Sequence, residues 1–183
     1  EGEWYFIETD FIIKLSAELD PLFIDNHEYL HQCEKKREDD YNISVKDSYP
    51  NVICLDKKSI SPNGQYQIEP CDLIYVKDGY LELAHIKIST RSSSLSHLFN
   101  QGINSVELLR RDEEAKDKLK ELIENNAGMI PFIDEGKYSV SYGIITKNDI
   151  QRKSKSLPIF SRISLLRTVH GLKTMNIPIK IHF

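Results

Sequence analysis

The sequence lacks the long apolar run that a membrane-spanning helix needs. Such a helix takes roughly 18 or more consecutive apolar residues, and no stretch of the 183-residue chain comes near that length. A secretory leader, in which an apolar segment follows a short basic one, is also missing from the start of the sequence. We therefore expect neither a membrane protein nor a secreted one.

Cysteine is scarce as well. The three cysteines, Cys33, Cys54 and Cys71, are odd in number and show no Cys-x-x-Cys spacing. A disulfide framework is therefore not expected, and we predict a reducing, cytoplasmic environment. The sequence begins with Glu1 rather than Met and stops inside an alternating apolar segment, 177–183, so we expect the chain to be part of a longer protein.

Positive charge is lacking overall but is concentrated near the carboxyl end. The formal net charge is −4, whereas residues 147–183 hold eight Lys or Arg and one Asp, a net of +7, which leaves −11 for the residues before them. A basic segment of this kind suits a phosphate-facing surface, although a solvated helix face would look the same in sequence. Charge alone does not decide between these interpretations.

The chain length fits a single domain. We predict that residues 1–26 form a lead-in segment that packs on the core of a domain spanning residues 27–183. Helices are predicted at about 27–47, 95–125 (one long helix, bent at Gly102) and 160–173, and strands at about 52–55, 65–76, 80–90, 138–145 and 177–183. Asp78-Gly79 is a strong signal for a tight hairpin. The order predicts an α/β fold with a mixed sheet flanked by helices and the hairpin at its centre.

The hairpin carries the residues with the clearest chemistry. Alternate residues of a strand point to the same face, so His85 and Lys87 should project together with Leu81 and Leu83. Asp72 precedes His85 by thirteen residues, and the tight turn can bring it alongside. A carboxylate and an imidazole can bind a divalent ion, while an ammonium group can hold a water or offset charge on a phosphate. This combination suits phosphodiester hydrolysis.

The same residues belong to a longer motif. It comprises Glu69-Pro70-Cys71-Asp72, then His85-Ile86-Lys87, then the run from Ser93 to Gly102, SSLSHLFNQG. In these segments the chain resembles the PD-(D/E)xK nuclease superfamily, and within it an uncharacterised, sporadically distributed bacterial family associated with mobile elements. The resemblance implies a restriction-endonuclease-like fold, Mg²⁺ or Mn²⁺ as cofactor, and DNA as the substrate, in phage or mobile-element defence.

One position departs from the superfamily pattern. Two residues before its lysine the superfamily usually has Asp or Glu, and here that place is held by His85. A neutral imidazole lowers the negative charge of the ligand set and favours Mn²⁺ or another transition ion over Mg²⁺. We therefore predict a metal site altered towards softer ions.

The resemblance also implies an acid on the first helix and a glutamine on the helix after the hairpin. Glu38 lies at the margin of the predicted apolar face and is our first choice as a metal ligand, with Glu34 second, because Asp39 points away from that face. Gln101 follows Lys87 by fourteen residues and is expected to face the site. An ordinary solvated helix residue is the alternative for each of them.

Phosphate contacts are predicted at two places. Ser93 and Ser94, near the start of the long helix, can cap it or bind phosphate there. The candidate DNA-binding cations of the basic segment are Arg152, Lys153, Lys155 and Arg162. His97 resembles a packing residue more than a ligand, and the group His27, His31 and Cys33 is too incomplete to predict zinc.

The leading functional hypothesis is a divalent-metal-dependent DNA endonuclease in which Asp72, His85 and Glu38 bind the metal. Lys87 would position the attacking water, and Gln101 would orient the water or the substrate. The alternative is a catalytically degenerate nucleic-acid-binding or scaffolding module with the same fold.

Overall fold

The computed structural model describes residues 7–25, 28–62 and 67–183. Its helices are α1 (Thr9–Leu19), η1 (Asp20–Leu22), α2 (Glu38–Ser48), α3 (Ser92–Arg111), α4 (Glu113–Leu122), η2 (Ala127–Met129), α5 (Ile130–Asp134), η3 (Ile150–Ser156) and α6 (Ile159–Thr174). Its strands are β1 (Ile53–Cys54), β2 (Leu73–Lys77), β3 (Tyr80–Lys87), β4 (Tyr138–Ile144) and β5 (Ile179–His182). The predicted α/β class is confirmed.

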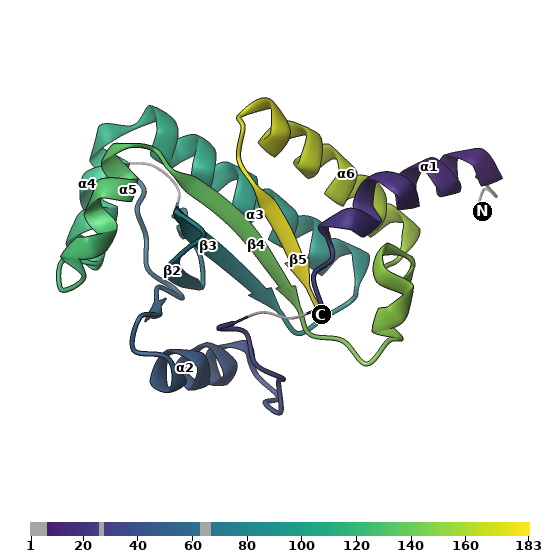
Figure 1. Ribbon diagram of the computed structural model, residues 1–183, viewed down its shortest axis with the longest axis horizontal. Helices are drawn as coiled ribbons and strands as arrows, with labels where there is room; N and C mark the ends of the chain where they lie inside the picture. Colours follow the sequence, from purple (N-terminus) through teal and green to yellow (C-terminus); the bar gives the residue numbers. More distant parts are fainter. Residues whose placement is uncertain (1–6, 26–27, 63–66) are drawn as a thin grey trace.

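The five strands form one mixed sheet in the order β1-β2-β3-β4-β5 (Figure 1). β1, β2 and β3 are antiparallel neighbours, and β4 and β5 add to β3 in parallel. The β2–β3 turn at Asp78 and Gly79 has φ values of 51° and 80°, as a type I′ hairpin turn requires. The hairpin therefore lies inside the sheet, as the Asp-Gly signal predicts.

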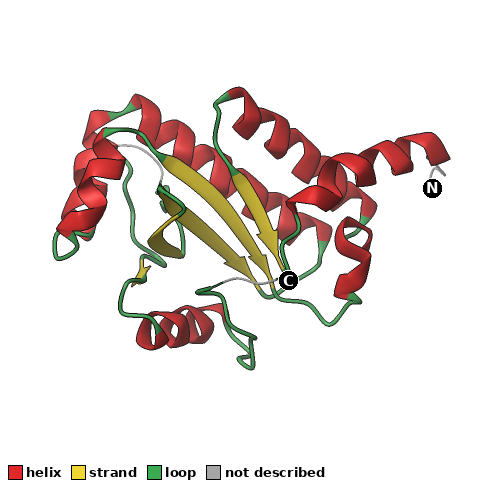
Figure 2. Ribbon diagram, viewed as in Figure 1, coloured by secondary structure: helices red, strands yellow, loops and turns green. Residues whose placement is uncertain are grey.

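Each face of the sheet has its own apolar layer. Leu81 and Leu83 of β3 pack into a core formed with α1, α3, α4 and α6, whereas Ala84 and Ile86 pack against Tyr41 of α2. The alternation along β3 thus agrees with the prediction. In Figure 2 the helix α3 crosses behind the strands. No helix among the described residues is both long and apolar enough to cross a bilayer.

The first helix of the domain is shorter than predicted. We expected it to begin near residue 27, but α2 begins at Glu38, and residues 28–37 contain no helix. Tyr29 of this segment instead packs its ring on Tyr75 of β2 and on Tyr49, with centroid distances of 4.8 and 5.5 Å. The apolar side chains of this segment are therefore partly buried against the sheet without a helix, which helical periodicity cannot reveal.

The predicted long helix is two helices, and it does not bend at Gly102. The break falls at Asp112, whose carboxylate accepts a 2.9 Å hydrogen bond from the Ala115 N–H and caps α4. Gly102 lies within α3 where Tyr142 of β4 packs closely, and a Cβ there would collide with the tyrosine ring. This glycine serves close packing of helix on sheet.

Two strand predictions also need correction. β4 is buried along its whole length rather than half-buried, because it lies between β3 and β5 with both faces covered. β2 begins at Leu73, and the described residues from Gln67 to Asp72 before it are irregular. This irregular segment contributes acidic side chains to the candidate metal centre described below.

The lead-in segment packs on the domain through α1. Leu15 and Leu19 of α1 are buried in the larger apolar core. Arg162 of α6 is only 5% exposed, and its guanidinium donates a 2.7 Å hydrogen bond to the Ser16 hydroxyl and a longer one to the Ile12 carbonyl. The prediction that Arg162 contacts DNA is therefore wrong, because this side chain joins α6 to α1 inside the protein.

Candidate metal centre

Three carboxylates meet beside the start of the hairpin. Asp56 lies two residues after β1, Asp72 immediately precedes β2, and Glu69 belongs to the segment that leads into β2. One oxygen from each can be chosen so that all three lie within 4.8 Å of one another. The β1–β2 pairing holds the group together, because the Leu55 N–H donates a 2.8 Å hydrogen bond to the Asp72 carbonyl. We call these three residues the acidic cluster.

Asp72 is the most confined member of the acidic cluster. Its Oδ2 accepts a 2.6 Å hydrogen bond from the Ile86 N–H on β3. Burial raises the pKa of Asp72 to about 7, and the negative charges of Asp56, Glu69 and Glu38 add to that effect, while the Ile86 hydrogen bond opposes it. Without a cation, the Asp72 carboxyl group therefore keeps its proton to a much higher pH than an ordinary aspartate does.

Glu69 shows the same repulsion in weaker form. Its pKa is raised first by desolvation and then by the charge of Asp56. A divalent cation would relieve both effects, because it prefers several oxygen ligands and compensates their charge. The arrangement therefore fits Mg²⁺ or Mn²⁺.

Lys87 lies near this cluster, paired with Glu38. The Lys87 Nζ is 2.8 Å from Glu38 Oε2, and the other carboxylate oxygen of Glu38 accepts a 3.0 Å hydrogen bond from the Ile88 N–H. Glu38 also acts electrostatically on Asp72, whose pKa it raises. The structure thus brings Asp72, Glu38 and Lys87 to one region. Glu34, the second choice, is exposed on the irregular segment before α2.

His85 is buried beside Tyr142. It is 2% exposed, its ring centroid is 5.9 Å from that of Tyr142, and Nε2 has no hydrogen-bond partner among the described residues. Desolvation lowers the pKa of His85 to about 3, so the ring stays neutral. The acidic cluster contains Asp72 but not His85, so the role of His85 as a metal ligand stays a prediction without support from the cluster.

Two cavities adjoin the acidic cluster. One, of about 320 Å³, is lined by the acids Glu38, Asp39 and Asp56, the cations Lys36, Arg37 and Lys57, and Ile88. The other, of about 330 Å³, is lined by Gln67, Ile68, Glu69, His97, Gln101 and Asn104. Gln101 therefore lines a cavity together with Glu69, and its expected role at the site stays a prediction.

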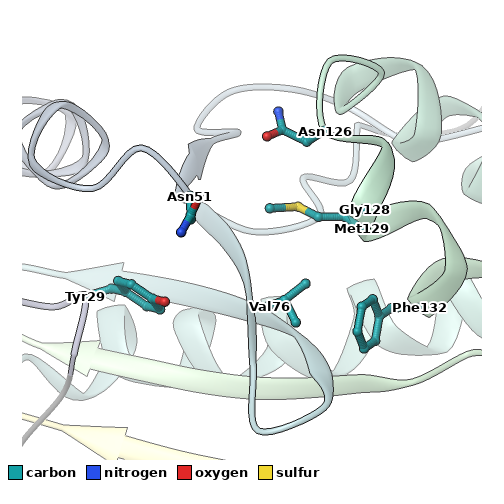
Figure 3. Close-up of a pocket in the computed structure, with 7 residues that line it drawn as sticks. All are labelled: Tyr29, Asn51, Val76, Asn126, Gly128, Met129 and Phe132. Carbon is teal, nitrogen blue, oxygen red and sulfur yellow. The ribbon is translucent and has the colours of Figure 1, made fainter.

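A further cavity lies at the other end of β2. It has a volume of about 300 Å³ and is lined by Tyr29, Asn51, Val76, Asn126, Gly128, Met129 and Phe132 (Figure 3). None of these lining residues carries a carboxylate, an imidazole or a cation. Its chemistry offers nothing to a metal, and the candidate centre remains at Asp72.

The predicted phosphate contacts have different outcomes. α3 has no side-chain cap, so Ser93 and Ser94 do not cap it; Ser93 is exposed and Ser94 is half-buried. Arg152 and Lys155 of η3 are exposed, and Lys153 is half-buried with a φ of 47°. These five residues keep their predicted DNA-binding role as a hypothesis.

The zinc interpretation gains no support. His27 lies outside the described residues, and Cys33 donates a 3.6 Å hydrogen bond to the Lys35 carbonyl. Across the described residues, the acidic cluster is the one group of three or more potential metal ligands with this close spacing.

Sequence reasoning missed Asp56 and gave Glu69 no role. Asp56 follows a strand that was correctly predicted, and Glu69 stands in the quoted Glu-x-x-Asp run. The available signal was the pairing of that strand with the hairpin, which places residues after β1 beside residues before β2. Antiparallel pairing could have been considered, but its register could not be read from the sequence.

Together, fold and site define an α/β protein whose mixed sheet carries a cluster of three half-buried carboxylates near one end. Residues 1–183 match the model of a family described as "Family of unknown function (DUF6119)", and the chain belongs to that family. Comparison with curated proteins gave no match. Comparison with solved structures gave none either.

Proposed function

We propose that this chain is a divalent-metal-dependent nuclease domain that hydrolyses phosphodiester bonds of DNA. The observation that carries the proposal is the acidic cluster of Asp56, Glu69 and Asp72, with the Lys87–Glu38 pair beside it. A strongly shifted buried carboxyl group next to further charges is typical of functional sites. The PD-(D/E)xK resemblance of the hairpin and of the α3 sequence supports the same activity.

The acidic cluster would hold the metal, and other groups would act on the substrate. A divalent ion bound there would supply Lewis-acid polarisation of a phosphoryl oxygen and activation of water. Glu38 fixes the Lys87 ammonium group through a 2.8 Å contact, so that this group can hold a water or offset negative charge on the phosphate. The Ile86 N–H holds Asp72 in place through its 2.6 Å hydrogen bond.

The ligand set in this proposal differs from the one expected from sequence. Asp56 and Glu69 replace His85 and Glu38 beside Asp72, so all three protein ligands are carboxylates. Oxygen ligands suit Mg²⁺ as well as Mn²⁺. The preference for softer ions that an imidazole ligand would cause is therefore no longer part of the proposal.

DNA as the substrate is supported by the cations around the cluster. Lys36, Arg37 and Lys57 line the cavity that Asp56 borders, and Lys or Arg side chains beside a metal can neutralise phosphates. Arg37 and Lys57 both contact Asp39, at 2.6 and 3.6 Å, so this acid, which also lines the cavity, offsets part of their charge until a divalent ion adds its own. The cavity can thus receive a phosphate next to the metal.

Calorimetric titration with Mn²⁺ tests the metal site. Asp72→Asn keeps an oxygen for the Ile86 N–H but removes a charged ligand, so we expect Mn²⁺ affinity to fall by at least about tenfold. Asp47→Asn is the matched control, because Asp47 is an exposed acid of α2 that is not in the cluster, and it should bind Mn²⁺ as the wild type does. Equal Mn²⁺ affinities for wild type and Asp72→Asn would show that Asp72 does not bind the metal, and the proposed site would be rejected.

A cleavage assay completes the test. Wild type should cleave DNA with Mg²⁺ or Mn²⁺, Asp72→Asn should lose this activity, and Lys87→Ala should lose it while still binding Mn²⁺. DNA binding without Mn²⁺ uptake or cleavage would instead identify the alternative, a nucleic-acid-binding module without catalysis. Cleavage that survives both substitutions would place the chemistry elsewhere.

A further inference from the structure

The cavity that contains Gln101 differs in chemistry from its neighbour. His97, Gln101 and Asn104 of α3 are spaced four and three residues apart, so they share one helix face, and Gln67, Ile68 and Glu69 form the facing wall. No Lys or Arg is among the lining residues. Three side-chain amides, an imidazole and an isoleucine make a surface suited to a neutral, polar ring.

The two cavities are joined through the acidic cluster. Asp56 lines the cavity with Lys36, Arg37 and Lys57, Glu69 lines the amide cavity, and oxygens of these two acids lie within 4.8 Å. The first cavity carries three cations balanced by three acids, Glu38, Asp39 and Asp56, and a divalent ion at the acidic cluster would tip this balance in favour of a phosphate. The amide side has no cation, and Glu69 is its charged group. A ligand that fills both must therefore carry a phosphate and a neutral polar group next to each other.

We propose that the amide cavity binds one unpaired nucleobase of the DNA strand whose phosphate lies at the acidic cluster. This inference rests on the proposed function and adds the form of the substrate. Amide side chains offer a donor and an acceptor together, which is the pattern that base edges present, and an imidazole can stack on a base. The volume of about 330 Å³ is at the lower end for small-molecule pockets, which fits a single ring system.

This assignment predicts whether the DNA substrate is single-stranded or double-stranded. A base inside a duplex is paired and stacked, so its Watson–Crick edge is not accessible to a cavity of this kind. The base must come from a single strand or be turned out of the helix, at a cost of a few kcal/mol for a paired base. Single-stranded DNA is therefore the preferred substrate.

Asn104→Ala tests the inference, with Asn100→Ala as the matched control. Both asparagines are exposed on α3, but only Asn104 lines the cavity. Binding of a fluorescent single-stranded oligonucleotide would be measured in Mn²⁺ by anisotropy, next to the same oligonucleotide with abasic sites and to its duplex. Loss of an amide–base contact should weaken binding of the intact single strand by roughly 5- to 100-fold.

Three results together would support the inference. Asn104→Ala weakens binding of the intact single strand, abasic sites weaken binding of the wild type by a similar factor, and abasic sites have little further effect on Asn104→Ala. Asn100→Ala and wild type should agree, and both should bind the single strand more tightly than the duplex.

Other outcomes would overturn it in distinguishable ways. If wild type binds abasic and intact strands equally well, or if Asn104→Ala and Asn100→Ala behave alike, the base site is wrong while the metal site stands. Tighter binding of the duplex would also reject it. If Mn²⁺ uptake does not depend on Asp72, or if no oligonucleotide binds at all, the proposed function fails together with the inference.

Discussion

At the scale of single residues, Asp72 is both a candidate metal ligand and a group whose ionisation destabilises the fold. Its carboxyl group lies in a desolvated place near three other acids, and only the Ile86 N–H hydrogen bond favours its charged form. Ionising such a group costs free energy that folding must offset. A cation bound as the proposed function requires would remove this cost.

Asp72 should make the stability of the metal-free protein depend on pH. Because the pKa of Asp72 is raised from 3.8 to about 7, the folded state binds this proton more tightly than the unfolded state. Its contribution to stability is fully present below pH 3.8 and is lost as pH rises through 7. Three pKa units correspond to at most about 4 kcal/mol.

Thermal unfolding in EDTA, measured at pH 5 and at pH 8, checks this expectation. Relative to wild type, Asp72→Asn should raise the Tm at pH 8 by several degrees and change it little at pH 5. Adding Mn²⁺ at pH 8 should raise the Tm of wild type and not that of the variant. A Tm difference that is the same at both pH values would show that Asp72 is not held protonated in the fold.

His85 marks the limit of what the sequence could reveal at this scale. Strand alternation correctly placed it on the face of β3 opposite to Ala84 and Ile86. What alternation could not reveal is the depth of burial, because the covering groups come from far along the chain: Tyr142 lies beside the imidazole, and Phe99 packs edge-on against Tyr142 at 5.2 Å. The sequence therefore could not show that His85 is buried while Lys87, two residues on, is half-buried.

At the scale of elements, local signals predicted well and distant packing did not. The Asp78-Gly79 turn and the alternation around it predicted the hairpin that carries Asp72. The start of α2 was misplaced, because Tyr29 packs on the sheet from an irregular segment rather than from a helix face. The acidic cluster depends on the pairing of β1 with β2, and a two-residue strand gives too short a pattern to fix a register.

Gly102 gives a test of how α3 packs on the sheet. An added Cβ would lie 2.8 Å from Tyr142 Cζ and would press on the tyrosine hydroxyl, which donates a 2.9 Å hydrogen bond to the Phe99 carbonyl. Alanine is the better helix former by about 1 kcal/mol, yet overpacking costs roughly 1–3 kcal/mol. We expect Gly102→Ala to lower the free energy of unfolding despite its helix propensity.

Urea denaturation of Gly102→Ala and Gly128→Ala checks this packing argument. Gly128 is the matched control, because a Cβ there meets no atom within 4 Å, so its substitution should change stability by less than about 0.5 kcal/mol. A stabilising effect of Gly102→Ala would mean that helix propensity outweighs the contact with Tyr142 and that α3 can move away from the sheet.

At the scale of the whole molecule, the segregated charge is only partly available to a ligand. Arg162 of the carboxyl-terminal basic segment is buried in the interior, where desolvation lowers the pKa of its guanidinium. η3 keeps exposed cations and begins six residues after β4 ends. The last residue of β4 pairs with Lys87, so the chain leaves β4 towards η3 at the end of the sheet where the candidate site lies. Lys36, Arg37 and Lys57 add positive charge that lies far away in sequence.

The last prediction concerns the salt dependence of DNA binding. Each phosphate neutralised by a cation contributes about 0.7 to 0.9 to the slope of log affinity against log salt. If η3 contacts the DNA backbone, replacing Arg152, Lys153 and Lys155 by glutamine should lower that slope by roughly 2 to 3. The control replaces Lys14, Arg167 and Lys173, which are exposed on α1 and α6. It removes the same charge, so any effect of net charge alone will appear in both triple variants.

Anisotropy titrations from low to moderate salt measure the slopes. A reduced slope confined to the η3 variant would place the DNA backbone along η3, whereas equal slopes in the two variants would leave Lys36, Arg37 and Lys57 as the cations that hold the phosphates.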